Sequence, residues 1–377
     1  MIHRRSYTAF GPRLLPILIV AVVCLLTFGP ARVRAGEAVF PGSTWETIPP
    51  TDLNAACRDQ LAQVRDLLQK GATTALVAVQ DGRILFSYGP TERTSIIASA
   101  RKSVLAMIYG KYVADGTINL GRTLADLGMD DVGGLLPIER EATVRDLLTA
   151  RSAVYHPSSN GSDDLAFAPP RGSQRPGSYF LYNNWGFNAA GAAFEIMTGQ
   201  DLYRAFEADI GNPLQLQDYR AAAHRRDAHG DVTRSRYRPY HFVLSTRDMA
   251  RIGYLMLQRG NWRGRQLIPA DWVTRITTRT TASADMHPAK TAAYHLNYGY
   301  LWWVFDEPET SPLAGAYTAW GQLGQFILVI PKRHMVIAHK REAPDSGSWE
   351  QPGIPRVRES EFLAVARLLA TAPCSSM

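Results

Sequence analysis

A serine and a lysine stand three residues apart in this chain, as Ser99 and Lys102. A serine hydroxyl is a poor nucleophile at its free pKa, so serine hydrolysis needs a base held beside it. In a helix, positions i and i+3 share a face, and Lys102 would therefore project beside Ser99. Arginine cannot replace lysine in this role because its guanidinium stays protonated. The spacing predicts a nucleophile with its base; the alternative is a chance S-x-x-K pattern on a helix surface.

Ser99 is also expected to open a helix that runs through Tyr112. The first N–H groups of a helix have no partner inside the helix, and the helix dipole favours negative charge at this end. A carbonyl that is becoming an oxyanion would be stabilised there. The position therefore suits attack on an ester or amide.

A tyrosine and an asparagine form the only Tyr-x-Asn pattern of the chain, Tyr182 and Asn184. A tyrosine near the Ser–Lys pair can relay a proton between nucleophile and leaving group. Asn184 can hydrogen-bond an acyl group or Lys102. In the alternative interpretation, Tyr182 is one aromatic residue of a buried cluster with Trp185 and Phe187.

A third segment, A-W-G-Q at residues 319–322, precedes a strand expected at 326–330. If an edge strand carries this segment, its backbone N–H groups could complete an oxyanion hole. Trp320, Gly321 and Gln322 are therefore candidate residues of the substrate and oxyanion site.

The order of these motifs resembles that of the serine β-lactamase-like hydrolases, which include class C β-lactamases, D-Ala-D-Ala carboxypeptidases, certain esterases and 6-aminohexanoate-dimer hydrolases. In that family S-x-x-K precedes Y-x-N, and a strand motif, K-T-G or a degenerate H-x-G or W-x-G, follows. Ser99, Lys102, Tyr182 and Asn184 match the first two motifs directly. The similarity spreads from about residue 75 to about residue 340. Its other segments are 144–149, 245–251, 298–303 and 324–331.

The resemblance implies an acyl-enzyme mechanism without a metal or cofactor. Lys102, assisted by Tyr182, would take the proton of Ser99, Ser99 would attack the carbonyl, and water would then release the acid. Which of Lys102 and Tyr182 is the base is open. The backbone N–H groups of Ser99 and Gln322 would hold the oxyanion.

The third motif departs from the family pattern. Where members that act on carboxylate-bearing substrates have a cationic lysine or histidine, this chain has Ala319 and Trp320. A small or neutral ester or amide is therefore the expected substrate, and Arg101 or His156 could supply a replacement charge. Two alternatives stay open: a β-lactamase or D-Ala-D-Ala carboxypeptidase, and a catalytically silent cell-envelope binding protein on the same fold.

Both ends of the chain show the pattern of a helix next to antiparallel strands. Asp81-Gly82, between two β-rich runs, is a strong hairpin signal. The predicted fold class is α/β (α+β), β-lactamase/transpeptidase-like: an antiparallel sheet with flanking terminal helices, from about 36–98 and 290–377, and an inserted helical part over about 99–289. The expected terminal elements are a helix at 52–69, strands at 75–79, 84–88, 326–330 and 335–339, and a last helix at 359–371.

Composition and charge exclude several classes of protein. The chain has 377 residues, 46% of them hydrophobic and 20% charged, which is typical of a globular protein and not of a disordered tail or a coiled coil. The net charge of +7 is mostly N-terminal, because residues 1–35 hold five arginines and no acid; without them 36 basic side chains face 34 acidic ones. This balance offers no footprint for nucleic acid.

The first 35 residues are typical of a signal peptide. Basic residues precede a 15-residue apolar run, Leu14 to Phe28, and Val33-Arg34-Ala35 resembles a cleavage site. The alternative is a helical membrane anchor, for which the run is short. Residues 36–377 would then form an exported domain, periplasmic or secreted, without a membrane span after cleavage. Arg4-Arg5 matches a twin-arginine signal poorly, so the export route stays open.

Two cysteines would remain after cleavage, Cys57 and Cys374, since Cys24 lies in the apolar run. Two thiols in an oxidising compartment suggest one bridge, and the alternative is two unrelated buried thiols. The family fold places the start of the first helix near the end of the last, so the resemblance implies a disulfide between them. In a chain-entropy model such a bridge stabilises the fold by about 4 to 5 kcal/mol.

The sequence motifs of other enzyme classes and of metal sites are absent or do not match. There is no G-x-S-x-G, no H-E-x-x-H and no glycine-rich phosphate loop. His224, Asp227, His229 and Asp231 match no standard metal-site spacing, and a solvated loop explains them better. The partner expected from the sequence is therefore a small molecule, an ester or an amide.

Overall fold

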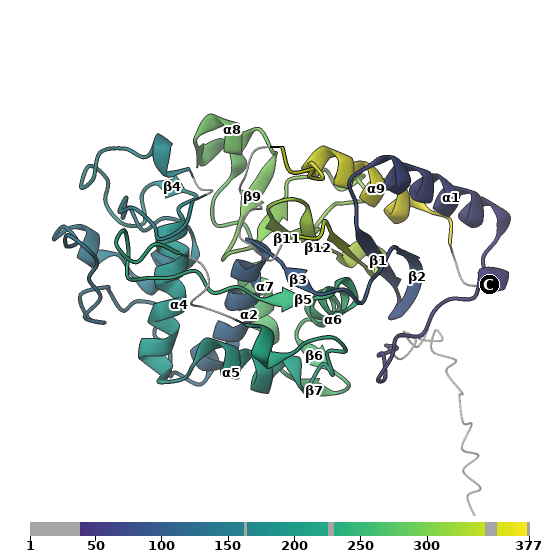
Figure 1. Ribbon diagram of the computed structural model, residues 1–377, viewed down its shortest axis with the longest axis horizontal. Helices are drawn as coiled ribbons and strands as arrows, with labels where there is room; N and C mark the ends of the chain where they lie inside the picture. Colours follow the sequence, from purple (N-terminus) through teal and green to yellow (C-terminus); the bar gives the residue numbers. More distant parts are fainter. Residues whose placement is uncertain (1–37, 162–163, 225–229, 344–352, 375–377) are drawn as a thin grey trace, which may run out of the picture. The chain divides into compact units, whose positions relative to one another are not determined.

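The central sheet joins the two ends of the chain, as the sequence predicts (Figure 1). It is seen in a computed structural model, which describes residues 38–161, 164–224, 230–343 and 353–374. In these residues the strand order is β2-β1-β13-β12-β11-β10-β9, and every neighbouring pair is antiparallel. The strands are β1 (Ala75–Gln80), β2 (Arg83–Tyr88), β9 (Leu296–Tyr298), β10 (Trp303–Phe305), β11 (Tyr317–Gly321), β12 (Gln325–Ile330) and β13 (Met335–Lys340).

The turn between β1 and β2 is the predicted two-residue hairpin. Asp81 and Gly82 have φ of 48° and 82°, and a type I′ turn needs positive φ at both central positions. Glycine is also required for space, because a Cβ at position 82 would lie 1.9 Å from the Val39 carbonyl oxygen. The Asp-Gly signal is confirmed.

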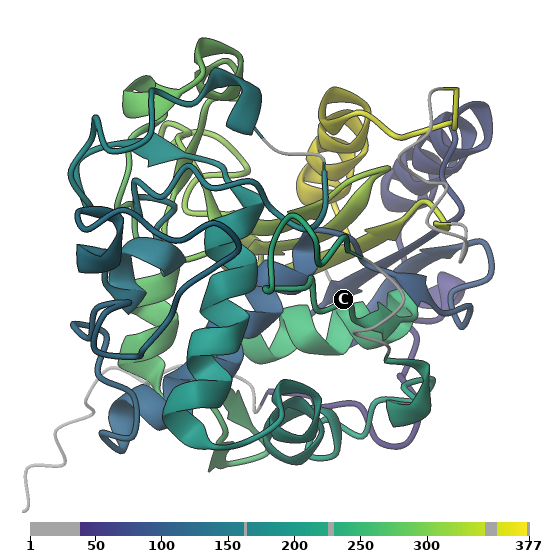
Figure 2. The same ribbon diagram turned by 60° about the vertical axis from the view of Figure 1, so that its left-hand side comes forward.

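Helices cover both faces of the sheet. The first and last helices lie side by side on one face, and a helix from the middle of the chain covers the opposite face (Figures 1 and 2). The structure thus confirms the antiparallel sheet with flanking terminal helices. These three helices are α1 (Ala55–Lys70), α9 (Glu359–Thr371) and α6 (Thr246–Leu257).

Strand β12 contacts the helices on both faces of the sheet. Its side chains alternate between the faces, as in any strand. The Phe326 ring stacks on Phe362 of α9 with ring centroids 4.1 Å apart, whereas Ile327 lies toward α6. A Cβ on Gly253 of α6 would come within 2.8 Å of the Ile327 side chain, so this glycine lets the helix approach the sheet closely. Both faces of β12 are buried, which accounts for its unbroken apolar run.

The expected division into a sheet part and an inserted helical part over 99–289 needs one correction. Helix α6 falls inside that range but packs on β1, β12 and β13. Its apolar stripe predicted a helix against a core, but periodicity does not say which element covers the stripe. The other helices are α2 (Ala100–Ala114), α3 (Val144–Leu148), α4 (Asn184–Thr198), α5 (Leu202–Phe206), α7 (Ala270–Ile276) and α8 (Ala289–Ala292). The short strands are β3 (Ser95–Ile96), β4 (Phe180–Leu181), β5 (Val243–Leu244), β6 (Asn261–Trp262), β7 (Arg265–Gln266) and β8 (Met286–His287).

A disulfide ties α1 to the segment that follows α9. It joins Cys57 and Cys374, whose Cα atoms are 5.0 Å apart, and it confirms the predicted pairing. The Asn54 side chain, which caps α1, also donates a hydrogen bond to the Pro373 carbonyl at 2.6 Å. The two ends of the described chain are therefore held together by covalent and polar contacts.

Removal of this bridge is expected to destabilise the protein. Cys57→Ala/Cys374→Ala frees a loop with a sequence separation of 317 residues, and the unfolded chain gains entropy. We expect the free energy of unfolding in guanidinium to fall by about 4 kcal/mol. The wild type with dithiothreitol serves as the control and should fall to the same level. Equal stability of the variant and the oxidised wild type would contradict this role.

In the described residues no helix is both long enough and apolar enough to cross a membrane. The predicted signal peptide, residues 1–35, lies outside the part of the chain that the structure describes.

Candidate active site

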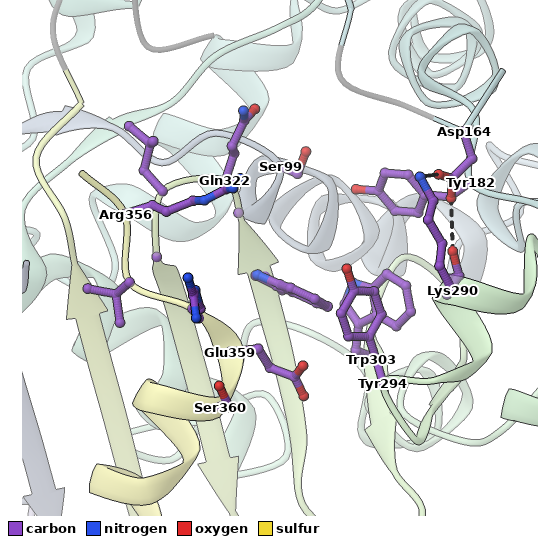
Figure 3. Close-up of a pocket in the computed structure, with 17 residues that line it drawn as sticks. Ser99, Asp164, Tyr182, Lys290, Tyr294, Trp303, Gln322, Arg356, Glu359 and Ser360 are labelled. Atoms are coloured by element: carbon purple, nitrogen blue, oxygen red, sulfur yellow. Dashed lines mark hydrogen bonds and ion pairs between the residues drawn. The ribbon is translucent and has the colours of Figure 1, made fainter. Parts of the chain in front are cut away.

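Ser99, Lys102 and Tyr182 meet at the start of α2. Ser99 directly precedes this helix, and Lys102 lies in its first turn. The Lys102 amine donates hydrogen bonds to Ser99 Oγ at 2.8 Å and to Tyr182 Oη at 2.7 Å. Lys102 is only 1% exposed, whereas Ser99 and Tyr182 are partly exposed and line a cavity (Figure 3). A hydroxyl, an amine and a phenol are thus within hydrogen-bond reach of one another beside a solvent-accessible space.

The turn that carries Ser99 has a strained backbone. Ala98 has a φ of 47°, a left-handed conformation that costs a non-glycine residue about 1 kcal/mol. The Ile97 N–H donates to the Phe242 carbonyl at 3.0 Å, and the Ala100 N–H donates to the Ile97 carbonyl at 3.1 Å. These bonds hold the turn in place. Such strain is common at functional sites, but no sequence pattern at Ala98 announces it.

A buried lysine anchors the strand that leads into this turn. Lys340 of β13 donates to the carbonyls of Ser95, at 3.0 Å, and Leu244. Both carbonyls belong to the β3–β5 ladder, in which Ser95 lies four residues before Ser99. Burial lowers the pKa of the Lys340 ammonium to about 7. This lysine therefore fixes the Ser99 segment to the central sheet.

Tyr182 lies both in an aromatic cluster and beside the Ser99–Lys102 pair. It is a member of an aromatic cluster, with its ring 4.7 Å from Phe187 and stacked at 5.7 Å on Trp303. The same cluster surrounds the amine, because Lys102 Nζ lies 4.3 Å from the Tyr182 ring centroid and 4.5 Å from that of Phe187. The apolar packing positions the phenol next to Lys102.

Gly321 brings the end of β11 against the Ser99 turn. A Cβ at this position would lie 2.4 Å from the Ile97 carbonyl oxygen and 3.0 Å from the Ala100 nitrogen, so only glycine allows the approach. Gln322 follows and lines the same cavity as Ser99. The expectation of an edge strand here is wrong, because β11 lies between β10 and β12. Since β10 pairs only with Tyr317 and Thr318, the last three residues of β11 are nevertheless unpaired on the side of α2.

Gly321→Ala is expected to impair the site without unfolding the protein. The added methyl must push β11 away from the Ser99 turn, and a misplacement of about 1 Å costs about 100-fold in rate. We expect kcat/KM for a hydrolysed ester to fall by about 10- to 100-fold. Gly42→Ala is the matched control, since its Cβ would meet only Arg263 at 4.0 Å. Equal rates for the two variants would show that the close approach is unimportant.

The cavity beside Ser99 has a volume of about 700 Å³ and an aromatic wall. Trp320 contacts Trp303 at 5.5 Å and Tyr294 at 4.8 Å between ring centroids. Trp320, Gly321 and Gln322, the sequence candidates for the substrate and oxyanion site, line the cavity. Sequence reasoning missed several lining residues, most of them in or next to α8 or around the start of α9: Asp164, Lys290, Thr291, Tyr294, Leu323, Gly324, Arg356, Val357, Arg358, Glu359 and Ser360.

Charged groups face the cavity from two sides (Figure 3). Lys290 is paired with Asp164 at 2.9 Å, and the Thr291 hydroxyl donates to Asp164 at 3.0 Å. On the other side Arg356 extends toward Gln322. No sequence motif marks these residues, because the loops that bring them to Ser99 are placed by tertiary packing.

Two of the residues that the sequence offered as replacement charges lie elsewhere. Arg101 is buried, donates to the Asn188 side chain at 2.8 Å and lies over the Tyr240 ring. His156 is buried and its ring nitrogens contact the carbonyls of Pro157 and Val132. Neither lines the cavity, so the expectation that one of them replaces the missing cation is wrong; the cations that do line it are Lys290, Arg356 and Arg358.

Asn184 is close to the site in sequence but does not line the cavity. It is the first residue of α4, is 2% exposed, and donates from Nδ2 to the Gly161 carbonyl at 2.5 Å. Its amide therefore holds the loop at Gly161. A direct contact with substrate is not supported.

The described residues contain no group of three or more His, Cys, Asp or Glu side chains that could hold a metal ion. Of the histidine and aspartate cluster singled out in the sequence, Asp227 and His229 lie outside the described residues.

Comparisons with known proteins agree with the geometry. The family model described as Beta-lactamase matches residues 62–339. An uncharacterized protein of Alkalihalophilus pseudofirmus, BpOF4_21049, is 23% identical over 262 residues, which are 64% of this chain and 71% of that protein.

Solved structures are similar in fold. A candidate 6-aminohexanoate-dimer hydrolase from Bacillus anthracis has a TM-score of 0.58 at 19% identity, covering 82% of both chains. An octameric penicillin-binding protein homologue from Pyrococcus abyssi has a TM-score of 0.56 at 15% identity, covering 85% of this chain and 79% of that one. A penicillin-binding protein homologue from Caulobacter crescentus has a TM-score of 0.54 at 16% identity, covering 76% and 93%. At these identities the likeness shows the fold.

Proposed function

Because the chain belongs to the β-lactamase family, we propose that it is a serine hydrolase that cleaves an ester or amide through a covalent acyl-enzyme on Ser99. One observation carries the proposal: the Lys102 amine contacts both Ser99 Oγ, at 2.8 Å, and Tyr182 Oη, at 2.7 Å. This is the contact that an activated nucleophile requires.

In the acylation step Ser99 Oγ attacks the carbonyl carbon while its proton passes to Lys102 Nζ. The carbonyl oxygen becomes an oxyanion between the N–H groups of Ser99 and Gln322, which donate no hydrogen bond to the described residues. When the tetrahedral intermediate collapses, the bond to the leaving alcohol or amine breaks. Tyr182, beside Lys102, relays the proton to that group.

In the deacylation step water attacks the acyl carbon of the Ser99 ester. The Lys102–Tyr182 pair accepts a proton from the water, and the intermediate collapses to the free acid. Ser99 recovers its hydrogen, so the enzyme returns to its starting state. Both steps use the same three side chains.

The cavity supports a substrate with an apolar portion. Trp303, Trp320 and Tyr294 form one wall, and Trp320 occupies the strand position next to Gly321. A flat aromatic wall packs against the hydrophobic part of a substrate near the scissile bond. We therefore propose a small ester or amide as the substrate class.

A second candidate function is that of a β-lactamase or D-Ala-D-Ala carboxypeptidase. The observation that favours it is Arg356, whose guanidinium can bind a substrate carboxylate and which extends toward Gln322 (Figure 3). Acylation of Ser99 by a penicillin would support this candidate.

We also propose that the protein is exported, as the N-terminal sequence predicts. The disulfide between Cys57 and Cys374 supports this, because such bonds persist in oxidising compartments. N-terminal sequencing of the mature protein should begin at Gly36. An intact N-terminus on protein isolated from the cytosol would contradict export.

A substrate panel tests the proposed activity. It consists of p-nitrophenyl esters, linear p-nitroanilides and a chromogenic cephalosporin, each assayed with wild type and with Ser99→Ala. We expect Ser99-dependent turnover of an ester or anilide. Turnover of the cephalosporin alone would favour the second candidate, and no turnover of any compound would favour a silent binding protein.

A further inference from the structure

A carboxylate without a counterion faces the cavity that contains Ser99. Glu359 is the first residue of α9, is partly buried, and lines this cavity. No hydrogen bond or ion pair joins its carboxylate to another residue of the described segments. Burial raises the pKa of the carboxyl to about 7. An ionised carboxylate held this way is costly unless a cation or donor compensates it.

The surroundings of Glu359 suit a particular kind of cation. Figure 3 shows Glu359 on the same side of the cavity as Tyr294 and Trp303. Trp320 connects these rings, with its centroid 4.8 Å from Tyr294 and 5.5 Å from Trp303. The π faces of tryptophan and tyrosine attract ammonium groups, and their area packs against alkyl chains. A carboxylate beside such a wall matches an alkylammonium group.

The cationic side chains of the cavity do not fill this role. Lys290 is paired with Asp164 at 2.9 Å. Arg356 extends toward Gln322, away from Glu359 (Figure 3). Arg358, the exposed N-cap residue of α9, also lines the cavity, but no ion pair joins it to Glu359 in the described residues. The carboxylate is therefore available to a ligand.

We propose that Glu359, Trp320 and Tyr294 form a subsite for a primary alkylammonium group, so that the preferred ester or amide carries a positively charged amine. That the ligand is a substrate rests on the proposed hydrolase function. The binding of the amine itself does not require turnover. The subsite lies in the same cavity as Ser99. One ligand can therefore place its cationic end in the subsite and its scissile bond at Ser99.

Binding of a simple amine tests the subsite independently of hydrolysis. Hexylammonium chloride and its uncharged analogue 1-hexanol are titrated by calorimetry into wild type and Glu359→Gln. We expect the variant to bind hexylammonium about 10-fold more weakly, since it loses the charged partner, and to bind hexanol as the wild type does. Trp320→Leu, which removes the π face, is expected to weaken hexylammonium about 5-fold.

Glu361→Gln is the matched control. Glu361 is another acid in the first turn of α9, it bonds the Arg358 N–H, and it does not line the cavity. Glu361→Gln shows how the loss of a carboxylate from the first turn of α9 affects the helix without changing the cavity. We expect hexylammonium binding to stay within about twofold of the wild type.

The pH dependence provides a second readout. Hexylammonium affinity should rise from about pH 6 to about pH 8 as the Glu359 carboxyl ionises, and Glu359→Gln should remove this rise. The other charged groups that face the cavity are Arg356, Arg358, Lys290 and Asp164.

The substrate arm compares two p-nitrophenyl esters of equal size, 4-(aminomethyl)benzoate and 4-ethylbenzoate. We expect the wild type to prefer the ammonium ester about 10-fold in kcat/KM, and Glu359→Gln to lose the preference. Equal hexylammonium affinity in wild type and Glu359→Gln would overturn the subsite. Absence of Ser99-dependent hydrolysis of either ester would instead count against the proposed function, and the two failures are distinguishable.

Discussion

Ser99→Ala is expected to reduce ester or amide hydrolysis to background, a loss of about 10⁵-fold in kcat. The hydroxyl is the nucleophile of the proposed reaction, and the other hydroxyl that contacts the Lys102 amine, Tyr182 Oη at 2.7 Å, is the proposed proton relay. The alanine fits the space, so the melting temperature should change by no more than a few degrees. Steady-state rates on the best ester of the panel provide the measurement.

Ser360→Ala is the matched control for Ser99→Ala. Ser360 also lines the cavity and carries the same hydroxyl, but it lies at the start of α9, on the far side of the cavity from Ser99 (Figure 3). We expect its rate to stay within about threefold of the wild type. If Ser360→Ala were inactive and Ser99→Ala active, the nucleophile would be assigned to the wrong serine.

Lys102→Met is expected to lower kcat/KM by about 10³- to 10⁴-fold. Methionine fills a similar volume among the rings of Tyr182 and Phe187 but can neither accept nor donate the proton. The loss should appear mainly in kcat, because Lys102 is 1% exposed and does not line the cavity where substrate binds. Burst kinetics with a p-nitrophenyl ester should show slow acylation.

Lys111→Met is the control for the loss of a lysine from the same helix. Lys111 lies in the last turn of α2, is exposed, and pairs with Asp209 at 2.7 Å. An exposed ion pair contributes about 0 to 1 kcal/mol to stability and nothing to the proposed chemistry. Full activity of Lys102→Met would remove the amine from the mechanism, whatever Lys111→Met does.

Much of the fold could be predicted because its signals are local. Asp81-Gly82 needs only two residues with positive φ to form its turn, and the last helix needs only the apolar spacing of 359–371. The Ser99–Lys102 pair follows from helix geometry in the same way, since i and i+3 share a face. The Cys57–Cys374 bridge followed from the family resemblance, which supplies the long-range pairing that spacing lacks.

The parts that could not be predicted depend on contacts between distant segments. Helix α6 has a recognisable apolar stripe, but the stripe does not say that β12 and β13 cover it. In the sequence Gly321 is an ordinary strand glycine. Only the structure shows that a Cβ at this position would lie 2.4 Å from the Ile97 carbonyl oxygen. Likewise, Arg356 and Glu359 carry no motif, because only tertiary packing brings the start of α9 to the cavity.

The central claim is that Ser99 is a nucleophile activated by Lys102, and covalent labelling tests it most directly. The purified protein is incubated with a fluorophosphonate probe, and its intact mass and tryptic peptides are measured for wild type, Ser99→Ala and Lys102→Met. We expect one probe per wild-type chain, located on Ser99, no labelling of Ser99→Ala, and strongly slowed labelling of Lys102→Met. Stoichiometric labelling of Ser99→Ala, or a probe found on another residue of the wild type, would contradict it.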